Sequence, residues 1–199
     1  MVEPVPNRSG RPRSTTVDDR IREAVLGLLA ERGPRAATVE AVAARSGVAK
    51  TTIYRRYDDH AAMLVGVVRG AVGVPEVPDA GDVRTRVHLA LEQLWRQLSD
   101  VLGPGGMAAL VSAAEPEDAR LLREAIDPYE LAMVDLVRRD IAAGLLRADL
   151  DADATVSLLL GGYLGELLRR GSVGPDWLER CLDLVWPALS EPRGRRRRP

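Results

Sequence analysis

The chain has 199 residues, enough for one compact domain or for a small module joined to a larger one. Hydrophobic residues make up 46% of the chain, but no apolar run approaches the length of a membrane helix, and no basic-then-apolar signal segment opens it. We therefore expect a soluble cytoplasmic protein. Its one cysteine, Cys181, has no partner for an internal disulfide, and its apolar neighbours indicate a small core residue.

The formal net charge of −1 hides an uneven distribution along the chain. Residues 1–70 contain 12 Arg and Lys residues against 8 Asp and Glu, whereas residues 71–189 contain 11 against 20. Residues 190–199 are basic again, with 5 Arg against Glu191. A basic first third followed by an acidic body suggests that the first third binds a polyanion and that the body has another role.

The first residues read as an arm followed by two helices. Residues 1–16 contain three prolines and three arginines without apolar periodicity, so we expect a disordered basic arm. From Val17 onward apolar residues recur at helical spacing, until Gly33-Pro34 ends the first helix. Thr38 then suits the N-cap of a short second helix.

A short segment rich in hydrogen-bond donors follows the second helix. Gly47 supplies a turn residue that tolerates positive φ, and a third helix is expected from about Lys50 to Tyr57. Two short helices joined by such a turn have the geometry of a helix-turn-helix. With Ile53 turned inward at about 100° per residue, Thr51 and Arg55 point away from the core. The outward face is therefore polar and cationic, and it is short enough to lie in a major groove.

The third helix supplies most of the predicted DNA contacts. Its outward side chains suit base edges, because Arg can bond guanine and Thr can pair with a base edge or touch a thymine methyl group. The residues in this group are Lys50, Thr51 and Arg55. Its flanking side chains suit phosphates, which fix the register without reading sequence. The residues in this second group are Thr52, Tyr54 and Arg56. The alternative is an ordinary amphipathic helix with a solvated basic face. The full set of residues expected at DNA is Thr38, Lys50, Thr51, Thr52, Tyr54, Arg55, Arg56, Tyr57 and His60.

Several short motifs occur together between residues 21 and 64. They are Glu31-Arg32-Gly33 at the end of the first helix, Thr38, Val42-Ala43, Gly47-Val48, and Thr52-Ile53-Tyr54 with an aromatic residue at Tyr57. In combination they resemble the DNA-binding domain of TetR-family transcriptional regulators. The resemblance implies an all-helical homodimer that binds a palindromic operator in double-stranded DNA and represses transcription until a small molecule binds its C-terminal domain.

Three residues depart from the usual pattern of that family. Ala49 stands where the family commonly has a Ser or Thr cap, so the third helix should begin less stably by about 1 kcal/mol. His60 stands where a lysine often meets a phosphate, which makes any such contact sensitive to pH. Glu40 lies where some members read a base with arginine. A glutamate there can accept a hydrogen bond from cytosine N4 or face solvent, and we favour solvent.

The second part of the chain predicts longer helices. A fourth helix runs from His60 to about Gly73, capped by Asp58 or Asp59, and a stretch rich in Pro and Gly follows it. The next helix is expected from about Asp82 to Leu102, and the GPGG sequence at 103–106 separates it from a short helix that ends at about Ala114. The last three helices are expected from about Glu117 to Ala143, from Asp151 or Asp153 to Arg170, and from Pro175 to Leu189. This makes an all-α fold of about nine helices. The expected domains are a three-helix helix-turn-helix domain (17–60), a larger effector-binding and dimerisation domain (61–189) and a disordered Arg-rich tail (190–199).

The last two helices carry broad apolar stripes, and Gly161, Gly162 and Gly165 would let another helix approach closely. They resemble the two helices that pair across the family's dimer axis, with an intradomain core as the alternative. The residues expected at the dimer interface are Leu160, Tyr163, Leu164, Leu167, Leu178, Cys181, Leu182 and Val185.

The remaining helices are expected to enclose an effector cavity lined by side chains that combine apolar bulk with a few polar atoms. The candidates, each of which also suits a simple core, are His88, Trp95, Met107, Leu110, Tyr129 and Met133. Such walls indicate an apolar or aromatic small molecule.

Other functions find little support in the sequence. The two histidines are His60 and His88, and no Ser/His/Asp, metal-ligand or Gly-rich phosphate constellation accompanies them, so we predict no enzyme, metal or cofactor. A regulator that acts constitutively or through a protein partner, without a small-molecule effector, stays open as the alternative. The GRPR sequence at 10–13 suits a minor groove or a disordered leader equally, and the terminal arginines are expected to form a solvated tail.

Overall fold

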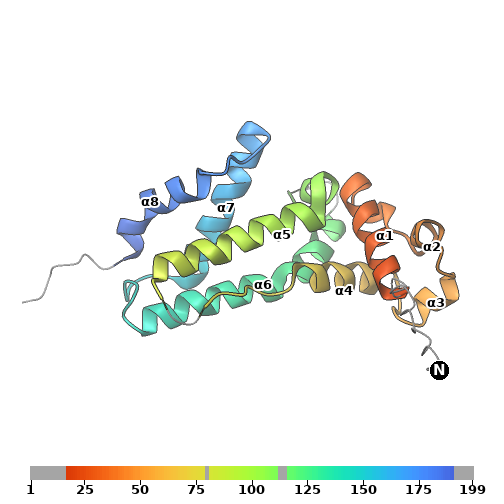
Figure 1. Ribbon diagram of the computed structural model, residues 1–199, viewed down its shortest axis with the longest axis horizontal. Helices are drawn as coiled ribbons and strands as arrows, with labels where there is room; N and C mark the ends of the chain where they lie inside the picture. The colour runs from red at the N-terminus through yellow and green to blue at the C-terminus, as the bar shows by residue number, and fades with distance from the viewer. Residues whose placement is uncertain (1–16, 79–80, 112–115, 191–199) are drawn as a thin grey trace, which may run out of the picture.

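Eight α-helices and one 3-10 helix make up the regular structure of the described residues, and no strand occurs among them (Figure 1). The described residues of this computed structural model are 17–78, 81–111 and 116–190. The elements are α1 (Val17–Arg32), η1 (Pro34–Ala36), α2 (Val39–Ser46), α3 (Lys50–Tyr54), α4 (His60–Val72), α5 (Val83–Val111), α6 (Pro116–Ala142), α7 (Ala152–Arg170) and α8 (Trp177–Leu189). The all-α prediction is confirmed. The expected basic arm, and the Arg-rich tail beyond Ser190, lie outside the described residues.

The short helices begin and end where the sequence provides caps and turns. The Thr38 hydroxyl accepts a hydrogen bond from the Ala41 amide at 3.1 Å and caps α2. Gly47 ends α2 in the left-handed region, with φ 65° and ψ 19°, where an L side chain would be strained. The Asp59 carboxylate accepts from the Ala62 amide at 2.7 Å and caps α4. These groups satisfy backbone donors and acceptors that the helices themselves leave unpaired.

Helix α3 is shorter than predicted. It ends at Tyr54, whereas the predicted helix extended to about Tyr57. The Ile53 carbonyl accepts from both the Arg56 amide at 2.9 Å and the Tyr57 amide at 3.1 Å, so the chain tightens into a turn after one and a half turns of helix. Ala49 stands at the N-cap and forms no side-chain hydrogen bond, because its methyl group cannot accept one.

The two helices predicted on either side of the GPGG sequence join into one kinked helix, α5. Gly103 interrupts it with φ 56° and ψ −171°, and α1 packs against this kink. A methyl group on Gly103 would lie 2.5 Å from the Ala30 Cβ, and one on Gly105 would lie 2.6 Å from both the Gly33 nitrogen and the Leu29 carbonyl oxygen. The glycines therefore permit both the kink and the close approach of two backbones. The end of the predicted short helix, at 112–114, lies outside the described residues.

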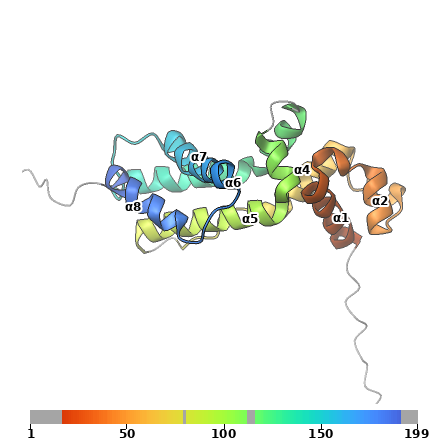
Figure 2. The ribbon, with the colours of Figure 1, turned by 90° about the horizontal axis from the view of Figure 1, so that it is seen from above.

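The helices are arranged along one long axis. Figures 1 and 2 show α1, α2 and α3 at one end, α5 and α6 along the length of the molecule, and α7 and α8 at the other end. The contact between α1 and α5 is the most extensive between any two elements, and α4 packs against both α6 and α5. One cluster of buried apolar residues extends from Ile21 in α1 to Leu189 in α8. The end that carries α3 is therefore packed continuously onto the rest of the chain.

A buried ion pair joins α5 to α6 inside this core. Arg86 and Asp140 are 6% and 4% exposed, and the guanidinium of Arg86 donates to the carboxylate of Asp140. Burial raises the pKa of Asp140, and the positive charge of Arg86 opposes that rise. Because a lone charge at this depth is costly, each member depends on the other.

Helix α7 begins where the sequence predicts, whereas α8 begins two residues later than predicted. Asp151 caps α7 by accepting from the Ala154 amide at 3.0 Å, which agrees with one of the two predicted starts. Helix α8 begins at Trp177, after Asp176 and not at Pro175. Pro175 instead forms part of the loop between α7 and α8, and this loop bounds a cavity described below.

Candidate DNA-binding surface and effector cavity

Helix α3 presents a donor-rich face over an apolar base. Ile53 is fully buried, in the same core cluster as Val42 and Val48. Tyr54, three positions after the exposed Thr51, is 51% exposed. Ile53 therefore anchors the helix, while Thr51 and Tyr54 are exposed to another molecule.

Two of the cations predicted to contact DNA are held by carboxylates. The Lys50 ammonium lies 2.9 Å from a Glu40 oxygen, and this hydrogen bond lowers the pKa of the Glu40 carboxyl. The Arg56 guanidinium lies 2.5 Å from an Asp18 oxygen at the start of α1. Arg55 is exposed and forms no ion pair with any residue that the structure describes. Arg55 is consequently the cation of this surface that is free to take a new partner without breaking an existing bond.

The other predicted contact residues have partners inside the protein. The Thr38 hydroxyl is engaged as the α2 cap. The Tyr57 ring is partly buried against Gly66 of α4, and burial raises the pKa of its hydroxyl. The His60 Nε2 lies 3.3 Å from the Pro34 carbonyl oxygen, so its ring faces η1. Thr52 is partly buried, and its carbonyl accepts from Arg56. Contacts of these residues with DNA stay predictions.

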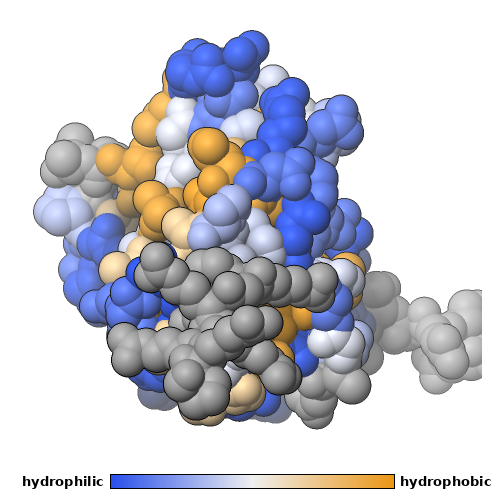
Figure 3. Space-filling model, turned by 90° about the vertical axis from the view of Figure 1, so that its left-hand side faces the viewer, coloured by the Kyte–Doolittle hydropathy of each residue, from blue (hydrophilic) through white to orange (hydrophobic). Residues whose placement is uncertain are grey.

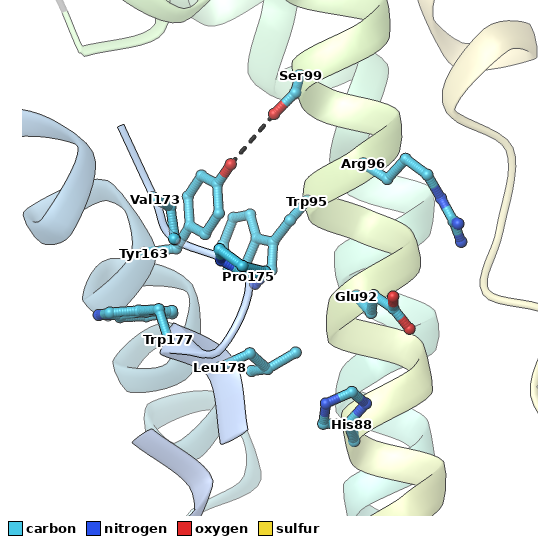
Figure 4. A pocket seen from close by; sticks show the side chains of 11 residues that line it. His88, Glu92, Trp95, Arg96, Ser99, Tyr163, Val173, Pro175, Trp177 and Leu178 are labelled. Atoms are coloured by element: carbon cyan, nitrogen blue, oxygen red, sulfur yellow. Dashed lines mark hydrogen bonds between the residues drawn. The ribbon is translucent and has the colours of Figure 1, made fainter. Parts of the chain in front are cut away.

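A cavity of about 340 Å³ lies between α5 and the loop that joins α7 to α8 (Figure 4). Three aromatic side chains in contact form its wall. The rings of Trp95 and Tyr163 stack with centroids 4.0 Å apart and an interplanar angle of 5°. Trp177 meets Tyr163 at 5.9 Å and 84°, edge against face. The hydroxyls of Ser99 and Tyr163 lie 3.1 Å apart, which fixes the phenol ring relative to α5.

The structure brings together only part of the predicted effector wall. His88 and Trp95 line this cavity, as their shared helix face allows. Leu110 and Trp95 line a smaller apolar hollow of about 60 Å³, and Met107 lines a third of about 190 Å³. Tyr129 and Met133 are 1% exposed and line none of these three spaces.

Tyr129 instead belongs to the core. Its hydroxyl donates to the Ala90 carbonyl at 3.0 Å, and burial raises its pKa to about 12. A hydroxyl that is bonded and buried in this way holds α5 to α6. The sequence alone could not distinguish this tyrosine from a cavity-lining one, because both kinds lie on the inner face of a helix.

The residues predicted at the dimer interface also lie in several different environments. Tyr163 and Leu178 line the cavity, Leu160 and Leu164 line the smaller hollow, and Leu182 is fully buried within its own chain. Leu167, Cys181 and Val185 are partly buried. Burial also raises the pKa of the Cys181 thiol, which suits a packed side chain.

The apolar surface of α7 and α8 is carried by leucines that the sequence-based list omitted. Leu158, Leu168 and Leu184 are 64%, 72% and 81% exposed. Figure 3 faces the end of the molecule that carries these helices and shows apolar residues grouped beside hydrophilic ones. The missed signal is a spacing of three or four residues that places Leu158, Gly161, Gly165 and Leu168 on one face of α7.

Comparisons with known proteins agree with this architecture. The family model "Bacterial regulatory proteins, tetR family" matches residues 21–67, and "Tetracyclin repressor-like, C-terminal domain" matches residues 77–185. The HTH-type transcriptional regulator YdeS of Bacillus subtilis is 30% identical over 188 residues, which cover 92% of this chain and 93% of that protein. The two matched domains together span most of the chain.

Solved structures give the same result. The chain is similar to TylP, a TetR regulator from Streptomyces fradiae, with 26% identity, a TM-score of 0.69 and coverage of 90% of this chain and 89% of that one. It also shares its fold with FadR of Bacillus subtilis, solved in complex with stearoyl-CoA, with 15% identity, a TM-score of 0.63 and coverage of 84% and 95%.

No described helix contains a segment both long enough and apolar enough to span a membrane. The matched domains and relatives are those of transcriptional regulators and not of enzymes, which agrees with the donor-rich helix exposed at one end of the molecule. The chain belongs to the TetR family of DNA-binding transcriptional regulators.

Proposed function

We propose that the protein acts in the cytoplasm as a homodimeric repressor, which binds a palindromic operator through α3 and leaves it when a small molecule enters the cavity beside α5. The observation that carries this proposal is the construction of α3. A fully buried Ile53 anchors a helix that exposes Lys50, Thr51 and Tyr54, and the exposed Arg55 follows directly at its C-cap.

The exposed side chains of α3 suit two kinds of DNA contact. Arg55 and Thr51 are exposed, and Arg55 is unpaired among the described residues, which supports the expectation that these two contact base edges in the major groove. Tyr54 lies on a flank with its ring half exposed, where its hydroxyl can donate to a phosphate. Lys50 reaches a base only if it leaves Glu40 or carries that carboxylate with it into the groove.

The apolar face of α7 and α8 supports a homodimer. Three leucines that are each more than three-fifths exposed would lose that exposure against a second copy. A methyl group on Gly161 or Gly165 would meet nothing within 4 Å, so a helix of the partner has room to approach there. Two linked reading helices also bind two half-sites far more tightly than one helix binds a single half-site, because the second contact becomes intramolecular.

Helix α5 supports a link between effector and operator. Trp95 and Ser99 form part of the cavity wall, and one to two turns later Gly103 and Gly105 touch the end of α1. A ligand that moves α5 would therefore move α1 and the helices packed on it. In this proposal the region before α4 reads DNA, and α4 to α8 bind the effector and the second copy.

The test uses the full chain and DNA fragments from the neighbourhood of its gene. We expect specific binding of a palindromic site, two protomers per site, and an affinity that falls steeply as salt rises. Compounds that raise the unfolding temperature in a thermal-shift screen should then release the DNA. Absence of specific binding at low salt would contradict the regulator, and binding that no stabilising compound weakens would favour the alternative, a regulator without a small-molecule effector.

A further inference from the structure

We propose that the cavity beside Trp95 binds an uncharged ring compound whose carbonyl oxygen accepts a hydrogen bond from the Trp95 indole N–H. This inference rests on the proposed function and deepens it, because it assigns a chemical class to the effector of that same site. It is carried by the unpartnered indole nitrogen, by the position of the charged groups around the cavity and by the size of the cavity.

Trp95 contains a buried donor without an acceptor. Its side chain is 6% exposed, and its Nε1 has no hydrogen-bond partner among the described residues. An indole nitrogen can only donate, and buried indole N–H groups usually have a partner, because leaving such a donor unpaired costs free energy. Trp95 lines the cavity, so a ligand bound there can supply the missing acceptor.

The other polar atoms of the aromatic wall have less need of an acceptor. The hydroxyls of Ser99 and Tyr163 lie 3.1 Å apart and bond to each other. Figure 4 shows the indole nitrogen of Trp177 on the side of that ring that points away from Trp95 and Tyr163. The N–H of Trp95 is therefore the group in this wall that gains most from a ligand oxygen.

The charged groups favour an uncharged ligand. Glu92 and Arg96, one turn apart on α5, both line the cavity and form no ion pair with the described residues. Figure 4 shows both charged groups turned away from the three rings. A charged ligand group beside the rings would thus lose water without gaining an opposite charge, which is costly. A carbonyl oxygen accepts the indole hydrogen bond and avoids this cost.

The dimensions restrict the body of the ligand. A volume of about 340 Å³ lies near the lower end of the range for small-molecule sites, which is roughly 300–1,000 Å³. Val173, Pro175 and Leu178 add apolar surface to the aromatic wall. These features fit one or two fused rings that carry a single carbonyl group.

The loop between α7 and α8 gives the wall room to adjust. The indole N–H is closed off from water, so a ligand oxygen reaches it when the wall shifts. Gly174 and Pro175 form part of the loop side of the cavity and are exposed, and a methyl group on Gly174 would meet nothing within 4 Å. A segment with so few packed contacts moves at little cost.

The experiment compares three probes built on one bicyclic ring system. They are 1-tetralone, its isostere 1-methylidenetetralin, in which a methylidene group replaces the carbonyl oxygen, and the anion tetralin-1-carboxylate. Binding to the full chain is measured by NMR titration, and binding of its operator is measured on the same preparation. We expect the ketone to bind roughly tenfold more tightly than the isostere, because only the ketone pairs the buried donor, and more tightly than the anion.

The indole resonances report the hydrogen bond directly. The chain has three tryptophans, so its proton–nitrogen correlation spectrum contains three indole N–H signals. Trp177→Phe and Trp186→Phe assign two of them, and the third belongs to Trp95. At saturation with the ketone this third signal should move downfield, as hydrogen bonding requires, and it should move less with the isostere. This readout needs no replacement of the buried Trp95.

Two variants locate the preference for the ketone. Trp95→Phe removes the N–H and should reduce the roughly tenfold preference for ketone over isostere to about equal binding. Trp177→Phe is the matched control, since it removes an indole from the same wall whose nitrogen points elsewhere. It should change the binding of both probes by the same factor and leave the preference intact. Retained operator binding shows that each variant is folded.

Several results would overturn the inference. They are equal or tighter binding of the isostere or the anion, no saturable binding of the ketone by protein that binds its operator, a Trp95 signal that stays in place at saturation, and a ketone preference that survives Trp95→Phe. Each leaves the operator-binding regulator standing, because operator binding is measured separately. Loss of operator binding by the unmodified chain would instead count against the proposed function.

Discussion

The contact between α1 and the kink of α5 allows a sharp prediction for Gly105→Ala. The added methyl group would lie 2.6 Å from the Gly33 nitrogen and the Leu29 carbonyl oxygen, and 2.9 Å from the Ala30 carbonyl oxygen. All three atoms belong to the backbone, so no side chain can rotate out of the way. The end of α1 must move away from α5 by several tenths of an ångström.

The magnitude follows from two opposing terms. Overpacking of a tight contact costs about 1–3 kcal/mol, and the gain in helix propensity from Gly to Ala offsets up to about 1 kcal/mol. We expect a net loss of about 1–2 kcal/mol, or a fall of roughly 2–8 °C in the unfolding temperature for a chain of this size. Thermal unfolding followed by circular dichroism measures this directly.

Gly70→Ala provides the matched control. A methyl group on Gly70 in α4 would meet nothing within 4 Å, so this variant should keep or slightly raise the unfolding temperature through helix propensity alone. If Gly105→Ala unfolds at or above the temperature of the unmodified chain while Gly70→Ala behaves as expected, the two backbones are not in the close contact described, and α5 cannot transmit a small movement to α1.

Three further variants test the surface and the core. In a binding series with operator mutants, Arg55→Ala should reduce the base preference at one operator position by about 1–3 kcal/mol, whereas Tyr54→Phe should lower the affinity for all sequences alike. Equal losses of affinity on every sequence for both variants would refute the assignment of Arg55 to a base and Tyr54 to a phosphate. Glu40→Gln should raise DNA affinity and steepen its salt dependence, because it removes a negative charge and frees the lysine held at 2.9 Å; lower affinity on every operator variant would contradict this. Arg86→Met should lower the free energy of unfolding, measured in denaturant, by about 3–5 kcal/mol, because it leaves a buried carboxylate without its partner. Adding Asp140→Leu should restore much of this loss. Unchanged stability of Arg86→Met would contradict the reasoning.

The amino-terminal end of the fold follows closely from the sequence because its signals are local. Thr38, Gly47 and Asp59 each act on a backbone group within three or four residues, and such short-range chemistry depends little on the rest of the chain. The inward position of Ile53 follows from helical periodicity in the same way. The length of α3 does not, because the tight turn at residues 55–57 depends on how the chain reaches α4.

The cavity was harder to predict because it joins distant segments. His88 and Trp95 lie seven residues apart on one helix, and their shared face was visible in the sequence. Tyr163 and Trp177 reach the same cavity only because α7 packs on α6 and α8 packs on α5, which no local pattern encodes. The same limit explains Leu182, since an apolar stripe on a helix does not say which of its residues face the chain's own core.

The central claim is that two copies of the chain read a palindromic operator through α3. The most direct measurement is binding of the full chain to its upstream palindrome, compared with the same DNA carrying one scrambled half-site, across a range of salt concentrations. The account predicts two protomers on the intact site, a loss on the order of 100-fold or more when one half-site is scrambled, and affinity that falls steeply with salt. Equal affinity for the intact and half-scrambled DNA would contradict it.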